Sequence, residues 1–429
     1  MNILMLTNTY TPFVGGLERS IQTFTERLRG RGHRVKIVAP VFANTPIDEE
    51  DVIRVPAIQR FNGTDFSLQL PVPGMLKTAL EGFRPDIIHT HHPYLIGDTA
   101  LRLATSYEVP LVFTFHTLYE HYSHYSPIDS PQYKRFIITL STGFCNLCDR
   151  VIAPSASIKT LLAQRGVIRP ISVAPTGIDI GSFLSGDGAM FRREAGIPPD
   201  AFVVGTVARI APEKNLAFLQ EVLLRFLSSS GNAHFLMVGD GPSLQDVKDV
   251  FRARGLADRL HAVGALSGQQ LVDGYHAMDL FAFASQTETQ GMVLTESMAS
   301  GVPVVALDGP GVRDVLHNQN GGKLIDEESL DDFVKALGGY DALPEQEYAK
   351  IRIAAQEEAK GYSHEICTDN LLSVYKETLS KELFSHEVKA TLWKKTRQRL
   401  GAEMSLWSNV AQATHDAIAL SPETVEEMQ

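Results

Sequence analysis

Residues 278–305 read Met278-Asp-Leu-Phe-Ala-Phe-Ala-Ser-Gln-Thr-Glu-Thr-Gln-Gly-Met-Val-Leu-Thr-Glu-Ser-Met-Ala-Ser-Gly-Val-Pro-Val-Val305. The apolar run 278–284 is short and bounded by polar residues, which is typical of a parallel strand covered on both faces. Helix formers follow from Met292 to Ser300, before Gly301 stops the helix and Pro303 opens the next strand. This unit predicts a doubly wound α/β fold. Anionic ligands bind such folds where the loop leaves the strand and the helix begins.

Two carboxylates, Glu288 and Glu296, mark this turn. Glu288 lies in the loop and would point into the crevice at the sheet edge, whereas Glu296 could reach back from the helix to a ligand. A pair with this spacing is, by itself, more often an exposed loop acid and a solvated helix residue. The whole block, however, closely resembles the signature of retaining glycosyltransferases of family 4, which use nucleotide sugars on a GT-B fold.

The resemblance implies two Rossmann-like doubly wound domains facing across a crevice, with a C-terminal helix that crosses back to the first domain. It assigns Glu288 to the donor-sugar hydroxyls and Glu296 to the ribose hydroxyls. It also places the backbone amides of Gly291, Met292 and Val293 near the diphosphate.

One position departs from the common family pattern. Gln290 stands where an aromatic residue is usual. The resulting Thr-Glu-Thr-Gln-Gly resembles the variant in enzymes that glucosylate diacylglycerol, and it is a hint about the substrate class.

A chain of 429 residues with 44% hydrophobic content predicts two globular domains. Pro175-Thr-Gly-Ile-Asp179 resembles the family's linker between them. We therefore expect an acceptor-binding domain at 1–178, a nucleotide-sugar-binding domain at 179–362, a crossover helix at 363–380 and a basic amphipathic helical tail at 381–429.

Charge and cysteine content narrow the class of protein. The net charge of −11 argues against general nucleic-acid binding. Residues 1–177 hold 17 Lys and Arg against 14 Asp and Glu. This positive half is therefore the better candidate to bind an anionic surface, such as that of a membrane. Three cysteines indicate reduced thiols in a cytosolic setting. Without a recognisable signal peptide or membrane-length apolar run, we expect a soluble or peripheral protein.

The first loop carries a second piece of the resemblance. Two adjacent glycines, Gly15 and Gly16, at a helix entrance leave bare amides that can cradle a phosphate. A Gly-Gly turn is weak evidence alone. Pro12-Phe-Val-Gly-Gly-Leu-Glu18, however, matches the family's first-loop pattern, which implies a place beside the donor diphosphate and the acceptor.

The segment 113–127 is dense in His and Tyr, and such loops on a rigid scaffold are favoured places for binding. In the family, a His at the position of His116 lies in the reaction crevice, and this loop resembles that of diacylglycerol glucosyltransferases. We expect acceptor contacts from Tyr119, Glu120, His121 and Tyr125, against the alternative of a tyrosine-rich loop packed on its own helix.

Three further histidines, His89, His91 and His92, end the preceding strand. A metal site is the less favoured reading, because no carboxylate shares a metal-ligand spacing with them. Cys145-x-x-Cys148 likewise lacks a second pair and is better read as buried helix positions. We expect no metal and no cofactor beyond the UDP-sugar substrate.

Arg209 ends a predicted strand and Lys214 precedes a helix, so both cations could meet one anion. They could also be two surface cations. Val-Ala-Arg-Ile-Ala-Pro-Glu-Lys-Asn215 matches the family's diphosphate clamp. The catalytic set expected from the resemblance is therefore His116, Arg209, Lys214 and Glu288.

The function predicted is transfer of a hexose, glucose first, from a UDP-sugar to a lipid such as diacylglycerol at the inner face of the membrane. Alternatives are a family 4 enzyme acting on a soluble sugar or polysaccharide intermediate, a nucleotide-sugar epimerase on the same architecture, and a non-catalytic nucleotide-sugar sensor.

The tail combines basic and apolar residues at helical spacing. Its basic residues outnumber the acidic Glu382 and Glu387, and both tryptophans of the chain, Trp393 and Trp407, fall here. Such a helix suits the interface of an anionic membrane, although an apolar stripe more often packs against the protein. The basic residues are Lys381, Lys389, Lys394, Lys395, Arg397 and Arg399, and the apolar ones are Phe384, Val388, Leu392, Leu400, Met404 and Trp407.

Overall fold

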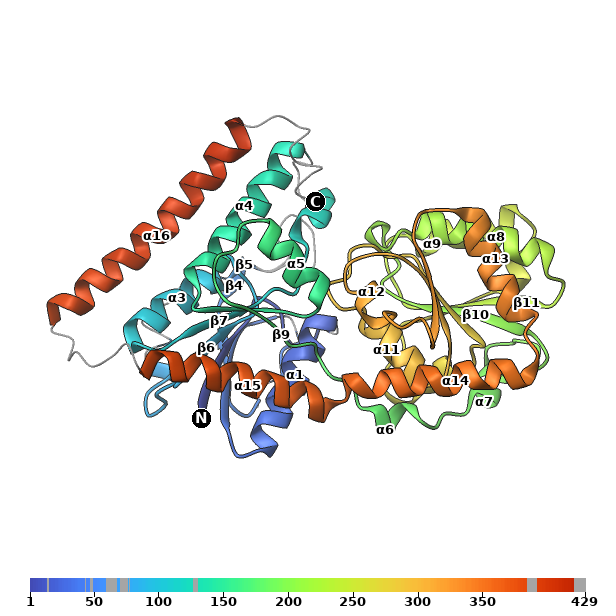
Figure 1. Ribbon diagram of the computed structural model, residues 1–429, viewed down its shortest axis with the longest axis horizontal. Helices are drawn as coiled ribbons and strands as arrows, with labels where there is room; N and C mark the ends of the chain where they lie inside the picture. Colours follow the sequence, from blue (N-terminus) through green and yellow to red (C-terminus); the bar gives the residue numbers. More distant parts are fainter. Residues whose placement is uncertain are drawn as a thin grey trace. The chain divides into compact units, whose positions relative to one another are not determined.

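The computed structural model describes residues 1–13, 15–42, 44–46, 49–58, 68–69, 76, 78–125, 130–383 and 392–419. They form two compact units, Met1–Thr176 with Cys367–Gln429, and Gly177–Ile366. In each unit, helices cover both faces of one parallel sheet (Figure 1). The boundary at Thr176 lies close to the predicted one at residue 178. Among the helices described, none is long and apolar enough to cross a bilayer.

The first unit contains a seven-stranded sheet of order β3-β2-β1-β6-β7-β8-β9. Its strands are β1 Asn2–Leu6, β2 Arg34–Pro40, β3 Val52–Val55, β6 Ile87–Thr90, β7 Leu111–Thr114, β8 Arg150–Ala153 and β9 Ile171–Val173, with a separate antiparallel pair of β4 Ala57–Ile58 and β5 Leu68–Gln69. Its helices are α1 Gly16–Gly30, α3 Ile96–Tyr107, η2 Tyr119–Tyr125, α4 Pro131–Leu147, α5 Ala156–Gln164, α15 His364–Leu383 (from Cys367 onward) and α16 Leu392–Ala419.

Alternation along the strands explains why helices cover both faces of this sheet. Leu4 and Leu6 of β1 pack in the cluster shared with α3, α4 and α5, whereas Ile3 and Met5 pack in the cluster of α1 and α15. Successive side chains of a strand point to opposite faces, so a strand buried on both sides must be apolar throughout. Tyr375 of α15 lies in this second cluster, as predicted for a helix that returns to the first domain.

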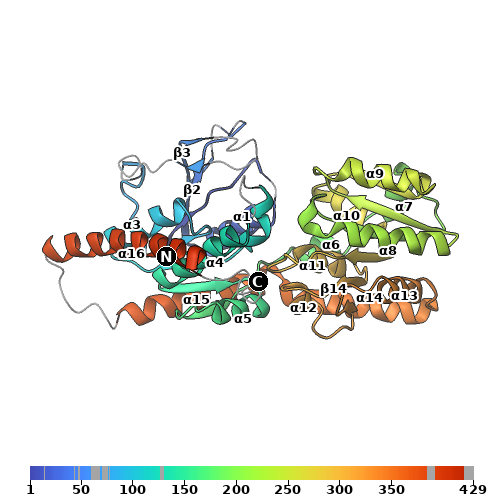
Figure 2. The ribbon, with the colours of Figure 1, turned by 90° about the horizontal axis from the view of Figure 1, so that it is seen from above.

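The second unit repeats the plan of helices around a parallel sheet (Figure 2). Its sheet has six strands in the order β12-β11-β10-β13-β14-β15. Its strands are β10 Phe202–Val207, β11 Ala233–Val238, β12 Leu260–Gly264, β13 Leu280–Phe283, β14 Val304–Leu307 and β15 Gly322–Ile325. Its helices are α6 Ile180–Phe183, α7 Gly188–Glu194, η3 Pro212–Lys214, α8 Leu216–Ser229, α9 Leu244–Ala253, η4 Ala257–Arg259, α10 Gly268–His276, α11 Met292–Ala299, α12 Val312–Val315, α13 Leu330–Asp341, α14 Glu345–Ala359 and η5 Lys360–Tyr362.

The strand order fixes where each unit can bind a ligand. In the second sheet the order reverses between β10 and β13, which pair with each other. In the first sheet it reverses between β1 and β6. Ligands of doubly wound sheets bind outside the carboxyl ends of the strands at such a switch point. The loops that follow these four strands are therefore the candidate site segments.

Candidate active site

In the second unit, the loops after β10 and β13 join a cation to a carboxylate. Lys214 Nζ donates a hydrogen bond to Glu288 Oε1 at 2.6 Å, and Ser285 Oγ donates to the same oxygen at 3.0 Å. Both members of the ion pair are partly exposed. Two residues predicted to serve neighbouring parts of one ligand are therefore in direct contact.

Arg209 stands exposed on the turn after β10. This turn packs tightly against the turn after β11, because Ile210 N–H donates to the Asp240 carbonyl at 2.9 Å. Gly239 has φ +138°, and a Cβ there would lie 1.8 Å from the Ala208 carbonyl oxygen. Only glycine permits this approach. This role of Gly239 was not predicted, although its place at a strand end before Asp240-Gly241 was a usable signal.

The loop after β13 turns into α11 at Gly291, whose φ of +73° is left-handed. Met292 and Val293 form the first turn and remain partly exposed. The first amides of a helix lack intrahelical acceptors, so this turn is suited to an anion. Gly311, which was not predicted, also shapes this loop, because a Cβ there would lie 2.6 Å from the Gln290 amide nitrogen and push the loop away.

Glu296 is held in place by a residue that the sequence analysis missed. Tyr275 Oη on α10 donates to Glu296 Oε2 at 2.8 Å, and the carboxylate residue is only 3% exposed. Tyr275 itself is fully buried. A tyrosine at an apolar helix position reads as core, so no sequence signal indicated this contact.

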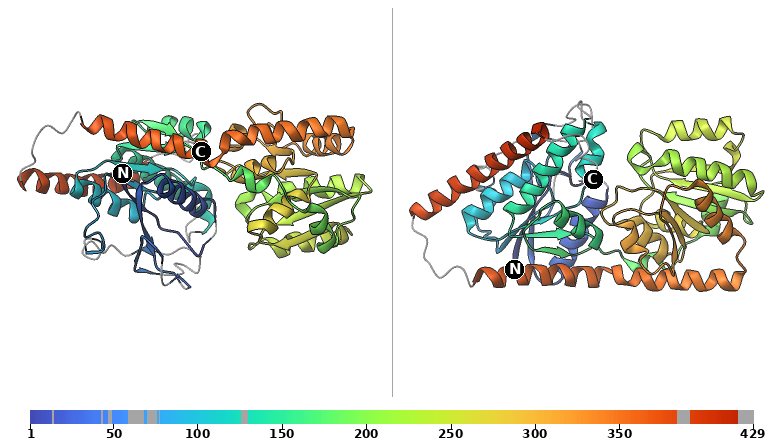
Figure 3. Two further views of the ribbon diagram at one scale, coloured as in Figure 1. Left: turned by 90° about the horizontal axis from the view of Figure 1, so that it is seen from below. Right: turned by 45° about the horizontal axis from the view of Figure 1, so that its top comes forward.

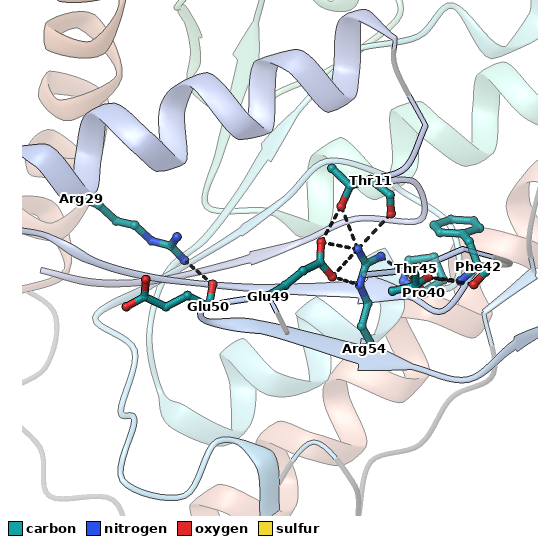
Figure 4. Close-up of polar contacts among 8 residues, drawn as sticks. All are labelled: Thr11, Arg29, Pro40, Phe42, Thr45, Glu49, Glu50 and Arg54. Carbon is teal, nitrogen blue, oxygen red and sulfur yellow. Dashed lines mark hydrogen bonds and ion pairs between the residues drawn. The ribbon is translucent and has the colours of Figure 1, made fainter. Parts of the chain in front are cut away.

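In the first unit, the loop after β1 is tied down at Thr11, in its middle (Figure 4). Arg54 Nη2 donates to the Thr11 carbonyl at 2.9 Å and to Thr11 Oγ1 at 2.8 Å, and it also bonds Glu49 Oε1 at 2.7 Å. Thr11 Oγ1 in turn donates to Glu49 Oε1 at 2.6 Å. This role of Arg54 was not predicted, although an arginine inside an apolar strand needs such partners.

The same loop ends at the helix that the two glycines open. Gly15 is the N-cap of α1 and has extended backbone, and a Cβ there would lie 2.6 Å from Glu18 Oε2. Gly16 begins the helix and is exposed. Glycine at position 15 therefore leaves room for the Glu18 carboxylate at the start of α1. Val14, which precedes Gly15, lies outside the described residues.

His116 follows β7 and is paired with His91, which directly follows β6. His91 Nδ1 and His116 Nε2 lie 2.9 Å apart, and the two rings stack. Burial lowers the pKa of both imidazoles well below the usual value, so both are neutral near pH 7. Two neutral imidazoles can share one N–H as donor and acceptor, which orients His116.

The remaining imidazoles of this cluster are used in hydrogen bonds. His89 bonds Tyr375 Oη through Nδ1 and Thr114 Oγ1 through Nε2, both at 2.7 Å. His92 Nδ1 accepts from the Asn8 amide at 3.1 Å. Burial lowers the pKa of His89 to about 3.

No metal-ligating group accompanies these histidines in the part of the chain that the structure describes, where no group of three or more His, Cys, Asp or Glu could hold an ion. Cys145 and Cys148 are free thiols buried in the core of the first unit.

The predicted acceptor segment forms η2. Tyr119 stacks edge-on with Tyr94 and Phe115, and His121 is partly buried. The expected acceptor contact from Glu120 is corrected by the structure. Glu120 is fully buried and forms an ion pair with Arg165. A buried carboxylate needs such a partner, which makes Glu120 a structural residue. The side chain of Tyr125 lies outside the described part, so its prediction stays open.

Comparison with known proteins agrees with this architecture. The family described as Glycosyltransferase Family 4 matches residues 14–182, and Glycosyl transferases group 1 matches residues 189–356. Alpha-monoglucosyldiacylglycerol synthase of Streptococcus pneumoniae is 29% identical over 343 residues, which are 76% of this chain and 75% of that protein. GDP-mannose-dependent alpha-mannosyltransferase of Mycobacterium tuberculosis is 31% identical over 387 residues, which are 87% of this chain and 96% of that protein.

Solved structures share the fold at low sequence identity. Anabaena HepE, solved with UDP and glucose, has a TM-score of 0.69 and 20% identity, covering 88% of this chain and 99% of that one. Sucrose-phosphate synthase of Thermosynechococcus elongatus has a TM-score of 0.73 and 19% identity, covering 89% of this chain and 100% of that one.

Proposed function

The chain belongs to glycosyltransferase family 4, and we propose that it transfers a hexose, glucose first, from a UDP-sugar to a diacylglycerol-type lipid with retention of configuration. The proposal places the protein peripherally at the cytoplasmic face of a membrane. The contact that carries it is the ion pair of Lys214 with Glu288. This pair sets a cation suited to a diphosphate beside a carboxylate suited to sugar hydroxyls, at the switch point of one sheet.

The donor would occupy the second unit. Glu296, fixed by Tyr275, is placed to accept hydrogen bonds from ribose hydroxyls. Arg209, Lys214 and the first amides of α11 would bind the diphosphate, because cations and free amides both stabilise phosphate oxygens. When the donor binds, Lys214 would exchange part of its contact with Glu288 for phosphate, which releases Glu288 for the sugar.

The reaction proposed is a front-face substitution at the anomeric carbon. The acceptor hydroxyl oxygen forms a bond to that carbon while the bond from the carbon to the UDP oxygen breaks. The electron pair of the broken bond stays on the diphosphate, whose oxygen takes the acceptor proton. The charge that develops there is stabilised by Arg209 and Lys214. We propose that no metal ion is needed.

The acceptor would use the first unit. His116 lies partly exposed beyond β7, and His91 orients its ring. Tyr119 and His121 of η2 follow His116 closely in the sequence and would offer aromatic surface to an acyl-glycerol. The diacylglycerol acceptor is supported by the name of the Streptococcus pneumoniae relative and by a second such synthase from Acholeplasma laidlawii, 26% identical over 318 residues.

A second candidate is mannosyl transfer from GDP-mannose. It is favoured by the 31% identity to the Mycobacterium tuberculosis mannosyltransferase, which this chain covers almost completely. The two candidates share the transfer chemistry and differ in the base and the sugar of the donor.

The test is to incubate the protein with labelled UDP-glucose, UDP-galactose or GDP-mannose and diacylglycerol in detergent micelles. Label from UDP-glucose should move into the organic phase only when diacylglycerol is present. Transfer from GDP-mannose alone would select the second candidate. Label that stays in the aqueous phase as a new glycoside would indicate a soluble acceptor, and an acceptor-independent change of the sugar would indicate an epimerase.

A further inference from the structure

The helix α16 is fastened to the first unit along one side, where it lies beside α3 and α4 (Figure 3). Leu406 is buried there, and Asn409 Nδ2 donates to the Leu140 carbonyl of α4 at 3.0 Å. Glu403 forms an ion pair with Arg102 of α3 at 2.6 Å. The orientation of α16 about its own axis is therefore fixed.

The opposite side of α16 leaves apolar side chains in solvent. Met404 is 72% exposed, Trp407 is 73% exposed and Val410 is 42% exposed. Met404 and Trp407 are neighbours on this side, whereas Val410 is displaced around the helix toward the packed side. Packing of this helix against the protein was the alternative to membrane binding, and the helix does pack on α3 and α4. Met404 and Trp407, however, take no part in that packing.

Basic residues precede this exposed strip in the sequence of the same helix. Lys394, Lys395, Arg397 and Arg399 occur before Glu403, and no acidic residue stands among them. A rigidly held helix with an exposed Trp and a basic segment has the composition of helices that lie in the interface of anionic membranes.

We propose that this exposed strip, Met404, Trp407 and Val410, docks the first unit onto an anionic lipid bilayer. The inference rests on the proposed lipid acceptor and adds the surface by which the protein reaches it. Arg135, near the start of α4, donates to the Asp416 carbonyl of α16 at 3.2 Å. The far end of α16 therefore lies at the end of α4 next to η2, the segment proposed to bind the acceptor.

The experiment compares the full chain with the double variant Met404→Ser/Trp407→Ser. Each protein is floated with phosphatidylcholine vesicles that contain or lack phosphatidylglycerol. Ile168→Ser is the matched control, because Ile168 is 85% exposed in the first unit but lies outside α16. Deleting residues 381–429 would be a poorer test, since it would also uncover α3 and α4.

We expect the double variant to lose about tenfold or more in partition to anionic vesicles, since two apolar side chains no longer enter the interface. The control should bind as wild type, and high salt should weaken all binding. Equal flotation of double variant and wild type would overturn the proposal. So would light scattering that shows the wild type to be a dimer and the double variant a monomer, with neither floating.

A direct readout uses the small number of tryptophans. Trp393→Phe leaves Trp407 as the single tryptophan, and brominated phosphatidylglycerol should quench its fluorescence. Absence of quenching would contradict the docking. Turnover of diacylglycerol in detergent micelles separates the two claims. The double variant should keep micelle turnover and lose vesicle turnover, whereas a wild type inactive in micelles would reject the proposed function irrespective of flotation.

Discussion

Replacing Tyr275 with Phe tests whether Glu296 must be held in place for the nucleotide to bind. The change removes one hydroxyl and keeps the ring, which contacts Phe183 and Phe281 at centroid distances of 5.9 and 6.0 Å. Packing should therefore survive. Glu296 loses the phenol that donates at 2.8 Å to a carboxylate almost without solvent exposure.

The size of the effect follows from the charge of the acceptor. A hydrogen bond to a charged group contributes about 1.5–3 kcal/mol, and leaving a buried charge without it costs a similar amount. Each 1.4 kcal/mol corresponds to about a tenfold change in affinity. Part of this free energy is lost equally by the free and the UDP-bound protein, and that part does not change the affinity. We therefore expect an effect at the lower end of the range, which is about a tenfold rise in the Kd for UDP.

Calorimetric titration with UDP and 2′-deoxy-UDP is the assay. If Glu296 binds the ribose hydroxyls, Tyr275→Phe should weaken UDP more than the deoxy analogue and reduce the discrimination between them. Tyr362→Phe is the control, because its hydroxyl bonds the Asp314 carbonyl at 3.0 Å in the same unit. Wild-type affinity with undiminished discrimination in Tyr275→Phe would refute the assignment.

Four further outcomes test the site and the fold. Arg209→Ala and Lys214→Ala should each lower turnover about 100-fold, because each removes a donor to the negative charge that develops on the leaving diphosphate. Near-normal turnover in both variants would refute their assignment to the diphosphate. Glu288→Gln should impair transfer more than UDP binding, and calorimetry that shows the reverse would contradict its place at the sugar. Activity should survive exhaustive chelation, and loss that magnesium or manganese restores would refute metal-free transfer. Because burial lowers the pKa of His89 from 6.5 to about 3, the unfolded chain binds its proton first, so stability is lost as pH falls below about 6.5. Acidification from neutral pH to pH 5 should cost about 2 kcal/mol at this residue. Urea unfolding followed by hydrogen exchange of β6 should show a loss of stability on acidification that is smaller by about 2 kcal/mol in His89→Gln than in wild type or in the exposed control His317→Gln, because the buried His91 and His116 still contribute.

Much of the second unit's plan was open to prediction because its signals are local. The strand before Ser285, the glycine turn and the stop at Gly301 are set by residues within a few positions of one another, and β13 and α11 occur where the pattern places them. Packing around the site was less accessible. Arg54, Tyr275 and Gly311 act on partners from other elements, and their types fit equally well with an ordinary strand, core or turn position.

The motifs around Glu288 and Lys214 indicated the family by resemblance. The sequence by itself also determined the two α/β units and the elements that carry the candidate residues, since apolar periodicity and turn residues specify local structure. Only the tertiary structure decided which candidates meet. Lys214 and Glu288 are 74 positions apart and touch because a parallel sheet gathers the loops after its strands at one edge. Glu120 is a core residue because Arg165, at the end of α5, forms an ion pair with it. The apolar pattern of α16 did not predict which side of the helix is buried, because that depends on the neighbouring helices α3 and α4.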